Sequence, residues 1–226
     1  MQRTKAHQRY VHRLTGKPVP GATTIIKNLG WSTDALVAWA RKTALAGEDP
    51  NAVRDQAADI GTLAHAMIEE YLGEKYEAIP ETPLDRTEYP PAYVDTAEIA
   101  FQAFLDWEDS LKFFEPISSE ERLCHYDLLY GGTVDMVAKI NSAVVMVDFK
   151  TSNNVWPSHV IQCAAYREML LSHGNHDPGM GATILHINKN NGKFTPHYYT
   201  AEQLEPAWEV FQHCLELHYL KNKVIV

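Results

Sequence analysis

The sequence has few cysteines and no long apolar run. Cys124, Cys163 and Cys214 are spread through 226 residues without a C-x-x-C pair. A scattered, odd-numbered set is typical of reduced thiols and argues against a disulfide framework or a zinc site. The longest apolar runs, such as 143–147, are far shorter than the roughly 20 residues that cross a bilayer. The basic start at 1–5 has no apolar stretch behind it, so we expect no secretory signal and a cytoplasmic protein.

The chain also lacks an overall positive charge, which taken alone argues against a nucleic-acid-binding protein. Its net charge is −9, but residues 1–42 carry +7 and the remainder −16. A chain divided in this way can present one basic wall to a phosphate backbone, although chance clustering on a solvated surface is the alternative. We take Arg41 and Lys42 as the candidate phosphate contacts. The other basic residues of this segment are Arg3, Lys5, Arg9, Arg13, Lys17 and Lys27.

Hydrophobic periodicity predicts an α/β chain with helices first and a sheet afterwards. A short strand and turn at 9–18 and a brief helix from Thr23 begin the chain. The expected helices are 34–46, 51–72 (ended by Gly73), 92–113, 157–171 and 201–220. The expected strands are 120–126, 133–140, 143–150, 182–188 and 193–199. The order favours an antiparallel meander over repeated βαβ units, in one domain over 1–226 with a mainly helical part at 1–115 and a sheet core at 116–226.

The chemistry centres on two acids and a lysine in neighbouring strands. Asp148 and Lys150 are two residues apart on one strand, so they project from the same face. A two-residue turn at 141–142 lets the preceding strand place Asp135 beside them. Two carboxylates with a lysine suit a divalent cation that polarises a phosphodiester, while the lysine orients or activates water. A salt bridge on a polar sheet face is the competing interpretation of this pattern.

Three further residues lie in suggestive places. Gln162 and Tyr166 are four apart on the helix that follows the D-x-K strand, hence on one face near its end. His65 stands in G-T-L-A-H at 61–65, between two alanines that leave room for close approach. Taken singly, Gln162 is more simply interpreted as a surface residue, Tyr166 as a half-buried residue and His65 as a core histidine.

The ordered set of motifs is more specific than any one of them. G-T-x-x-H at 61–65, G-G-T-V-D at 131–135, V-D-F-K-T-S at 147–152 and Q-x-x-x-Y at 162–166 follow one another. From about Val19 to Tyr199 the chain resembles the PD-(D/E)XK nuclease superfamily. It is similar to the RecB-like and phage-type exonucleases of that superfamily, a group that includes the mitochondrial genome maintenance exonuclease. Val134 replaces the usual proline and Asp148 the usual glutamate, and neither change removes a metal ligand.

The resemblance implies an α-β-β-β-α-β core and a set of site residues. His65, Asp135, Asp148 and the backbone carbonyl of Phe149 would bind Mg²⁺ or Mn²⁺, and Lys150 would be the catalytic lysine. Gln162 and Tyr166 would position DNA or the sheet's end. An acid on the first core strand would complete the site, with Glu120 slightly preferred over its neighbour Glu121. Relatives with an iron–sulfur cluster need four suitably spaced cysteines, so we expect no cluster here. Trp39, Thr151 and Ser152 are further candidate DNA contacts.

The function expected from this resemblance is a metal-dependent deoxyribonuclease. We favour a phage-type exonuclease that acts from free DNA ends in recombination, repair or genome processing in a bacterial or phage-infected cell. DNA is the expected partner, with a recombination or replication protein as a further candidate and no membrane. The alternatives are a structure- or site-specific endonuclease, a non-catalytic DNA-end-binding protein, and an unrelated hydrolase using His65 and Glu69 as metal ligands.

Overall fold

The computed structural model describes residues 9–152, 154–174, 176–221 and 223–224. Arg3 and Lys5 of the basic segment lie outside the described residues. The helices are α1 (Ala22–Ile26), α2 (Thr33–Leu45), α3 (Pro50–Lys75), α4 (Pro91–Ser110), α5 (Pro157–Leu171) and α6 (Ala201–Lys221), with short 3-10 helices η2 (Lys27–Leu29) and η3 (Arg86–Glu88). The strands are β1 (Tyr10–Val11), β2 (Pro18–Val19), β3 (Phe114–Cys124), β4 (Gly131–Ile140), β5 (Ala143–Lys150), β6 (Gly181–Ile187) and β7 (Phe194–Tyr199).

The central sheet has five strands in the order β3-β4-β5-β6-β7. The pairs β3–β4 and β4–β5 are antiparallel, as expected for a meander. The chain then crosses over through α5, so that β5 and β6 are parallel, and β7 returns antiparallel to β6. A second, two-stranded sheet is formed by β1 and β2. The predicted mixed α/β architecture with a meander is therefore confirmed.

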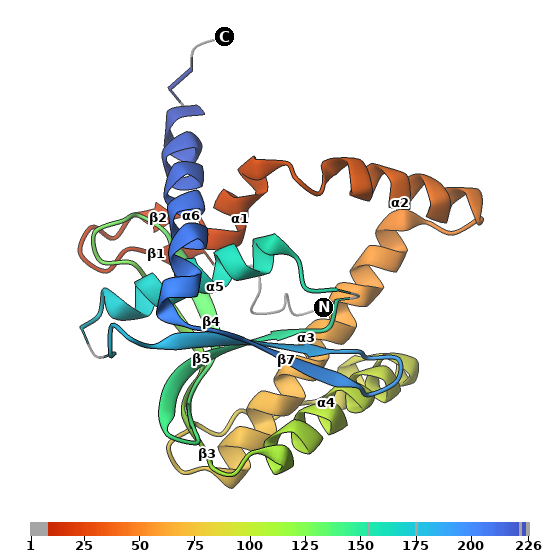
Figure 1. The fold of residues 1–226 in the computed structure, drawn as a ribbon. Helices are drawn as coiled ribbons and strands as arrows, with labels where there is room; N and C mark the ends of the chain where they lie inside the picture. Colours follow the sequence, from red (N-terminus) through yellow and green to blue (C-terminus); the bar gives the residue numbers. More distant parts are fainter. Residues whose placement is uncertain (1–8, 153, 175, 222, 225–226) are drawn as a thin grey trace.

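Two apolar layers cover the two faces of this sheet (Figure 1). On one face α1, α5 and α6 pack around Tyr166, Phe211 and Met146. On the other face α3 and α4 pack around Phe104, Trp107 and Phe149. Burying both faces explains why β5 reads as an almost continuous apolar run, A-V-V-M-V-D-F-K, and why its one buried acid stands out.

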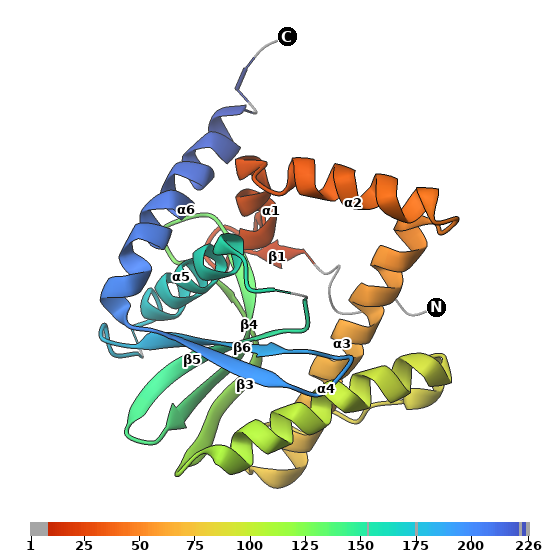
Figure 2. The ribbon, with the colours of Figure 1, turned by 45° about the vertical axis from the view of Figure 1, so that its right-hand side comes forward.

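Helix α2 differs from every other long helix because it does not pack on the sheet. It runs from the side of α1 to the start of α3, away from the strands (Figure 2). Of its thirteen residues only Thr43 is buried, and Leu36, Val37 and Trp39 are exposed. No helix in the described part of the chain combines the length and apolarity needed to cross a membrane.

Several element boundaries differ from the predicted ones. Helix α3 does not end at Gly73 but continues to Lys75, because the missing side chain lets the helix pack against the loop beyond it. A Cβ on Gly73 would lie 2.7 Å from the carbonyl oxygen of Pro80. The helix predicted to reach Phe113 ends at Ser110, and β3 begins at Phe114, six residues before the predicted start at Glu120.

A buried carboxylate ties the two helices of one layer together. Glu108 of α4 accepts hydrogen bonds from Tyr71 and Lys75 of α3, both at 2.7 Å, and one from Tyr76. Burial raises the pKa of Glu108, but these donors outweigh it and lower the pKa below its ordinary value. This network holds α3 against α4, and α3 carries the histidine of the candidate site.

Candidate active site

The candidate site lies where β4 and β5 stop pairing. Their register runs from Ile140↔Ala143 to Met136↔Val147, which leaves Asp135 and Asp148 as the next residues on the two strands. The backbone N–H of Phe149 donates a 2.8 Å hydrogen bond to Oδ2 of Asp135. On the same strand, Nζ of Lys150 lies 2.5 Å from Oδ2 of Asp148. The three residues singled out in G-G-T-V-D and V-D-F-K are thus brought together.

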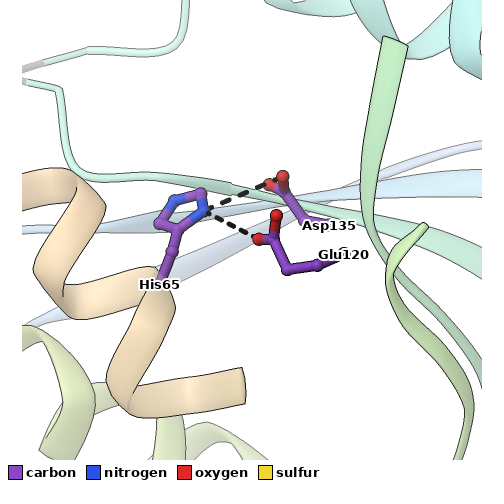
Figure 3. Close-up of side chains that lie close together, drawn as sticks. All are labelled: His65, Glu120 and Asp135. Carbon is purple, nitrogen blue, oxygen red and sulfur yellow. Dashed lines mark ion pairs between the residues drawn. The ribbon is translucent and has the colours of Figure 1, made fainter. Parts of the chain in front are cut away.

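Helix α3 brings His65 to these acids (Figure 3). Its Nδ1 atom lies 3.7 Å from Oε1 of Glu120 and 3.8 Å from Oδ1 of Asp135. One potential ligand atom from each of the three residues lies within 4.8 Å of the others. The imidazole also packs edge-on against Phe149, with ring centroids 5.6 Å apart. Histidine nitrogen and carboxylate oxygen are ligands that Mn²⁺ and Mg²⁺ accept in proteins.

The structure explains why the G-T-x-x-H motif begins with a glycine, which the sequence alone does not. Gly61 lies one turn before His65, on the same face of α3. A Cβ on Gly61 would lie 3.1 Å from Oγ1 of Thr151, tighter than ordinary van der Waals contact. The absence of a side chain therefore lets α3 cross close to the end of β5 and deliver His65 to the acids.

Of the adjacent acids Glu120 and Glu121, it is Glu120, the slightly preferred candidate, that faces the site. It stands opposite Asp135, between the pairs Ser119↔Met136 and Glu121↔Val134. Its φ of 49° lies in the left-handed region, which non-glycine residues rarely adopt. Strand alternation predicts opposite faces for neighbouring acids, but it could not predict this conformation or which acid adopts it.

Burial dominates the electrostatics of the site. It raises the pKa of both Asp135 and Asp148, although Lys150 and His65 oppose the rise. Burial alone would lower the pKa of His65, but Asp135 and Glu120 raise it above its ordinary value. Asp148 is 1% exposed, and its Oδ1 atom has no hydrogen-bond partner within the part of the chain that is described. Buried acids with an unsatisfied oxygen are costly unless a further positive charge joins them, so this donor set fits a divalent cation.

The Q-x-x-x-Y pair lies beside the site and supports the sheet. Tyr166 is 5% exposed and packs on Gly132, where a Cβ would lie 2.4 Å from its ring. Gln162 forms a side-chain hydrogen bond with Tyr166. Tyr166 therefore fills the space that the second glycine of G-G-T-V-D leaves open, three residues before Asp135 on β4.

The remaining predicted contacts are divided between two regions. Thr151 packs on Gly61, and the carbonyl of Ser152 accepts a 2.6 Å hydrogen bond from Nε2 of His186. Both residues therefore adjoin the D-x-K strand. Trp39, Arg41 and Lys42 lie instead on α2, outside the His65 cluster, with both cations exposed.

His159 was not predicted as a site residue. It lies in the first turn of α5, the helix that follows the D-x-K strand. Burial, together with the charge of the nearby Lys150, lowers the pKa of His159 to about 4. Its Nδ1 accepts a 3.3 Å hydrogen bond from the backbone N–H of Trp156. A neutral imidazole is thus held close to Lys150, and its place at the helix start after the motif strand was the available signal.

Acids and an imidazole that converge beside a lysine can hold a divalent cation of the kind that polarises a phosphodiester. The sequence model of the PD-(D/E)XK nuclease superfamily matches residues 37–222, so the chain belongs to that superfamily. Membership implies a nuclease hydrolase that uses divalent metal ions and takes DNA as substrate.

The solved structure described as "Crystal structure of SSO0001" is 11% identical over 70% of this chain and 74% of that chain, with a TM-score of 0.30. No curated protein matches the chain.

Proposed function

We propose that the protein is a Mg²⁺- or Mn²⁺-dependent exodeoxyribonuclease that hydrolyses phosphodiester bonds from a free DNA end. The proposal of catalysis rests on the convergence of His65, Glu120 and Asp135 beside the Asp148–Lys150 pair. The resemblance to phage-type exonucleases supports a role in recombination, repair or genome processing, with DNA as the partner.

The metal would be held by residues from three different elements. His65 of α3, Glu120 of β3 and Asp135 of β4 offer one ligand atom each, and the unsatisfied Oδ1 of Asp148 offers another. The backbone carbonyl of Phe149 is a further candidate ligand. When bound, the cation supplies Lewis-acid stabilisation of the negative charge that develops on the attacked phosphate.

The chain's own residues orient the reaction. Lys150 is held by Asp148, and although burial lowers its pKa, the two aspartates raise it above the ordinary value. We infer that Lys150 enters the reaction as an ammonium group, orienting the attacking water and stabilising phosphate charge instead of acting as a base. The hydrogen bond from Phe149 N–H fixes one oxygen of Asp135, which leaves the other to face His65.

The preference for a free end rests on α2. This helix exposes Trp39, Arg41 and Lys42 in a segment that packs on neither face of the sheet. Aromatic rings stack on unpaired bases and cations contact phosphates without sequence preference. We infer that α2 guides a single strand toward the metal. The endonuclease alternative predicts instead that internal bonds reach the metal directly.

Purified protein should degrade end-labelled DNA in the presence of Mg²⁺ or Mn²⁺ and leave it intact with a chelator. Parallel reactions with label at the 5′ or 3′ end, on single- and double-stranded DNA, report polarity and strand preference. Mononucleotide or short products released from one end support the proposal. DNA that remains intact with every metal would contradict nuclease activity.

His65→Ala should weaken Mn²⁺ binding by at least about tenfold, because it removes a nitrogen ligand from the cluster. DNA affinity measured in chelator should change much less, since His65 faces the acids. Isothermal titration calorimetry with Mn²⁺ measures the first effect. His213→Ala, an exposed histidine of α6, is the matched control. Equal Mn²⁺ affinity in His65→Ala and wild type would exclude His65 as a ligand.

A further inference from the structure

Three arginines surround a small pocket beside the β1–β2 hairpin. Its volume is about 150 Å³, and its lining includes Arg9 and Arg13 from the start of the chain and Arg122 from β3. The other lining residues are Tyr10, Val11, Leu123 and Cys124. Two of the arginines thus belong to the basic N-terminal segment, and the fold places them against a strand of the catalytic sheet.

The pocket is built on Tyr10. Its ring lies against Gly131, where a Cβ would be 2.6 Å from the Cβ of Tyr10, and its hydroxyl shares a 3.1 Å hydrogen bond with Oγ1 of Thr133. The guanidinium of Arg122 lies over this ring, with Cζ 4.8 Å from the centroid. The first glycine of G-G-T-V-D is therefore required for the close approach of Tyr10, and Tyr10 supports one of the three cations.

The pocket lies next to the metal-binding candidates along both strands. Arg122 follows Glu120 by two residues on β3, and Thr133 precedes Asp135 by two residues on β4. Two residues of strand span about 6.6 Å. Alternation places Thr133 on the same face of β4 as Asp135. A group bound by the arginines would thus lie beside the cleaved bond.

The charges of the pocket suit a phosphate. Arg9 and Arg13 are exposed, and neither makes an ion pair among the described residues. Burial raises the pKa of the Cys124 thiol, and both Arg122 and Arg13 oppose that rise, as expected for two cations that flank one side chain. Guanidinium groups bind phosphate oxygens in bidentate geometry, which makes arginine the favoured residue for this task.

We propose that the Arg9–Arg13–Arg122 pocket binds a phosphate group of the DNA strand whose neighbouring bond is cleaved. This inference rests on the proposed function. The β1–β2 hairpin lies outside the matched superfamily region of 37–222, whereas Arg122 lies inside it. The bound group is either a terminal phosphate, which would select the strand end, or an internal backbone phosphate, which would fix the register of the strand.

Fluorescence anisotropy in chelator tests the pocket without cleavage. Labelled single-stranded oligonucleotides carry a 5′-phosphate, a 3′-phosphate or only hydroxyl ends. Arg9→Ala/Arg13→Ala should bind the preferred oligonucleotide about tenfold more weakly, since charged hydrogen bonds to phosphate are lost. Losing one phosphate contact should also reduce the slope of log affinity against log salt by about 0.7. Loss confined to one phosphorylated end identifies a terminal phosphate, and equal loss for all three identifies an internal one.

The matched control removes two exposed lysines at the opposite end of the same strand pair. Lys112→Ala/Lys139→Ala deletes the same charge beyond the start of β3 and near the end of β4. If the arginine variant binds all oligonucleotides as tightly as this control, the pocket is not a phosphate site. Failure of the proposed function would show differently, as wild-type protein that never cleaves DNA when metal is added.

Cys124 offers a second measurement at the pocket itself. It is partly exposed, whereas Cys163 and Cys214 are buried. Oligonucleotide bound in the pocket should slow alkylation of Cys124 by a small maleimide in wild type and not in Arg9→Ala/Arg13→Ala, as followed by mass spectrometry. An alkylation rate that saturating oligonucleotide leaves unchanged in wild type would place the DNA elsewhere.

Discussion

Asp148→Asn and Lys150→Ala should each lower the metal-dependent cleavage rate by about 10²- to 10³-fold or more. Each substitution removes a charged side chain that is positioned to act on the metal or on the reacting phosphate. Asp148→Asn keeps the shape of the side chain and removes a metal-binding charge. Lys150→Ala removes the cation 2.5 Å from that carboxylate. Single-turnover cleavage of labelled DNA at saturating metal measures both effects.

The same two substitutions also disturb a buried ion pair, so stability has to be measured separately. Removing one partner of such a pair leaves the other unpaired and costs about 3–5 kcal/mol. The double variant Asp148→Asn/Lys150→Met removes both charges, so its melting temperature should recover toward that of wild type. Its activity should remain lost.

This combination separates catalysis from structure. If Asp148 and Lys150 formed only a salt bridge, restoring the fold in the double variant would also restore cleavage. Recovery of activity together with stability, or normal turnover by either single variant, would remove the pair from the proposed catalytic site.

The sheet and the motif residues were predictable because their signals are local. The turn at 141–142 fixes the β4–β5 register, and that register alone places Asp135 beside Asp148. Alternation then puts Lys150 with Asp148. The start of α5 was similarly marked by Pro157.

Other features depend on contacts between distant segments and were not predictable. Gly73 is a helix-ending residue by propensity, yet the loop at Pro80 packs on it and the helix continues. Glu120 adopts a left-handed conformation that no sequence pattern marks. Tyr10 meets Gly131 across more than a hundred residues of chain, so the arginine pocket becomes visible only in the folded protein. At Gly73 tertiary packing overrides the local preference.

Linear single-stranded DNA should be degraded in Mg²⁺, while the same DNA in circular form should remain intact. The physical basis is the bridge formed by α2, which stands apart from the sheet and joins α1 on one face to α3 on the other (Figure 2). His65 lies on α3. A strand that reaches the metal only by passing under this bridge needs an end to enter, and a closed circle has none. An open site would bind internal segments of either form equally well.

The two substrates should be prepared from one circular molecule, with the linear form made by a single cut, so that sequence and length are identical. Gel electrophoresis over time then reports loss of each form. Blocking one end of the linear DNA with biotin and streptavidin should protect it when the blocked end is the entry end, and leave it sensitive when the other end is blocked. A circle that is cut at a rate comparable to the linear DNA would identify an endonuclease. In that case α2 would line an open binding surface, and its Trp39, Arg41 and Lys42 would contact the strand from one side only.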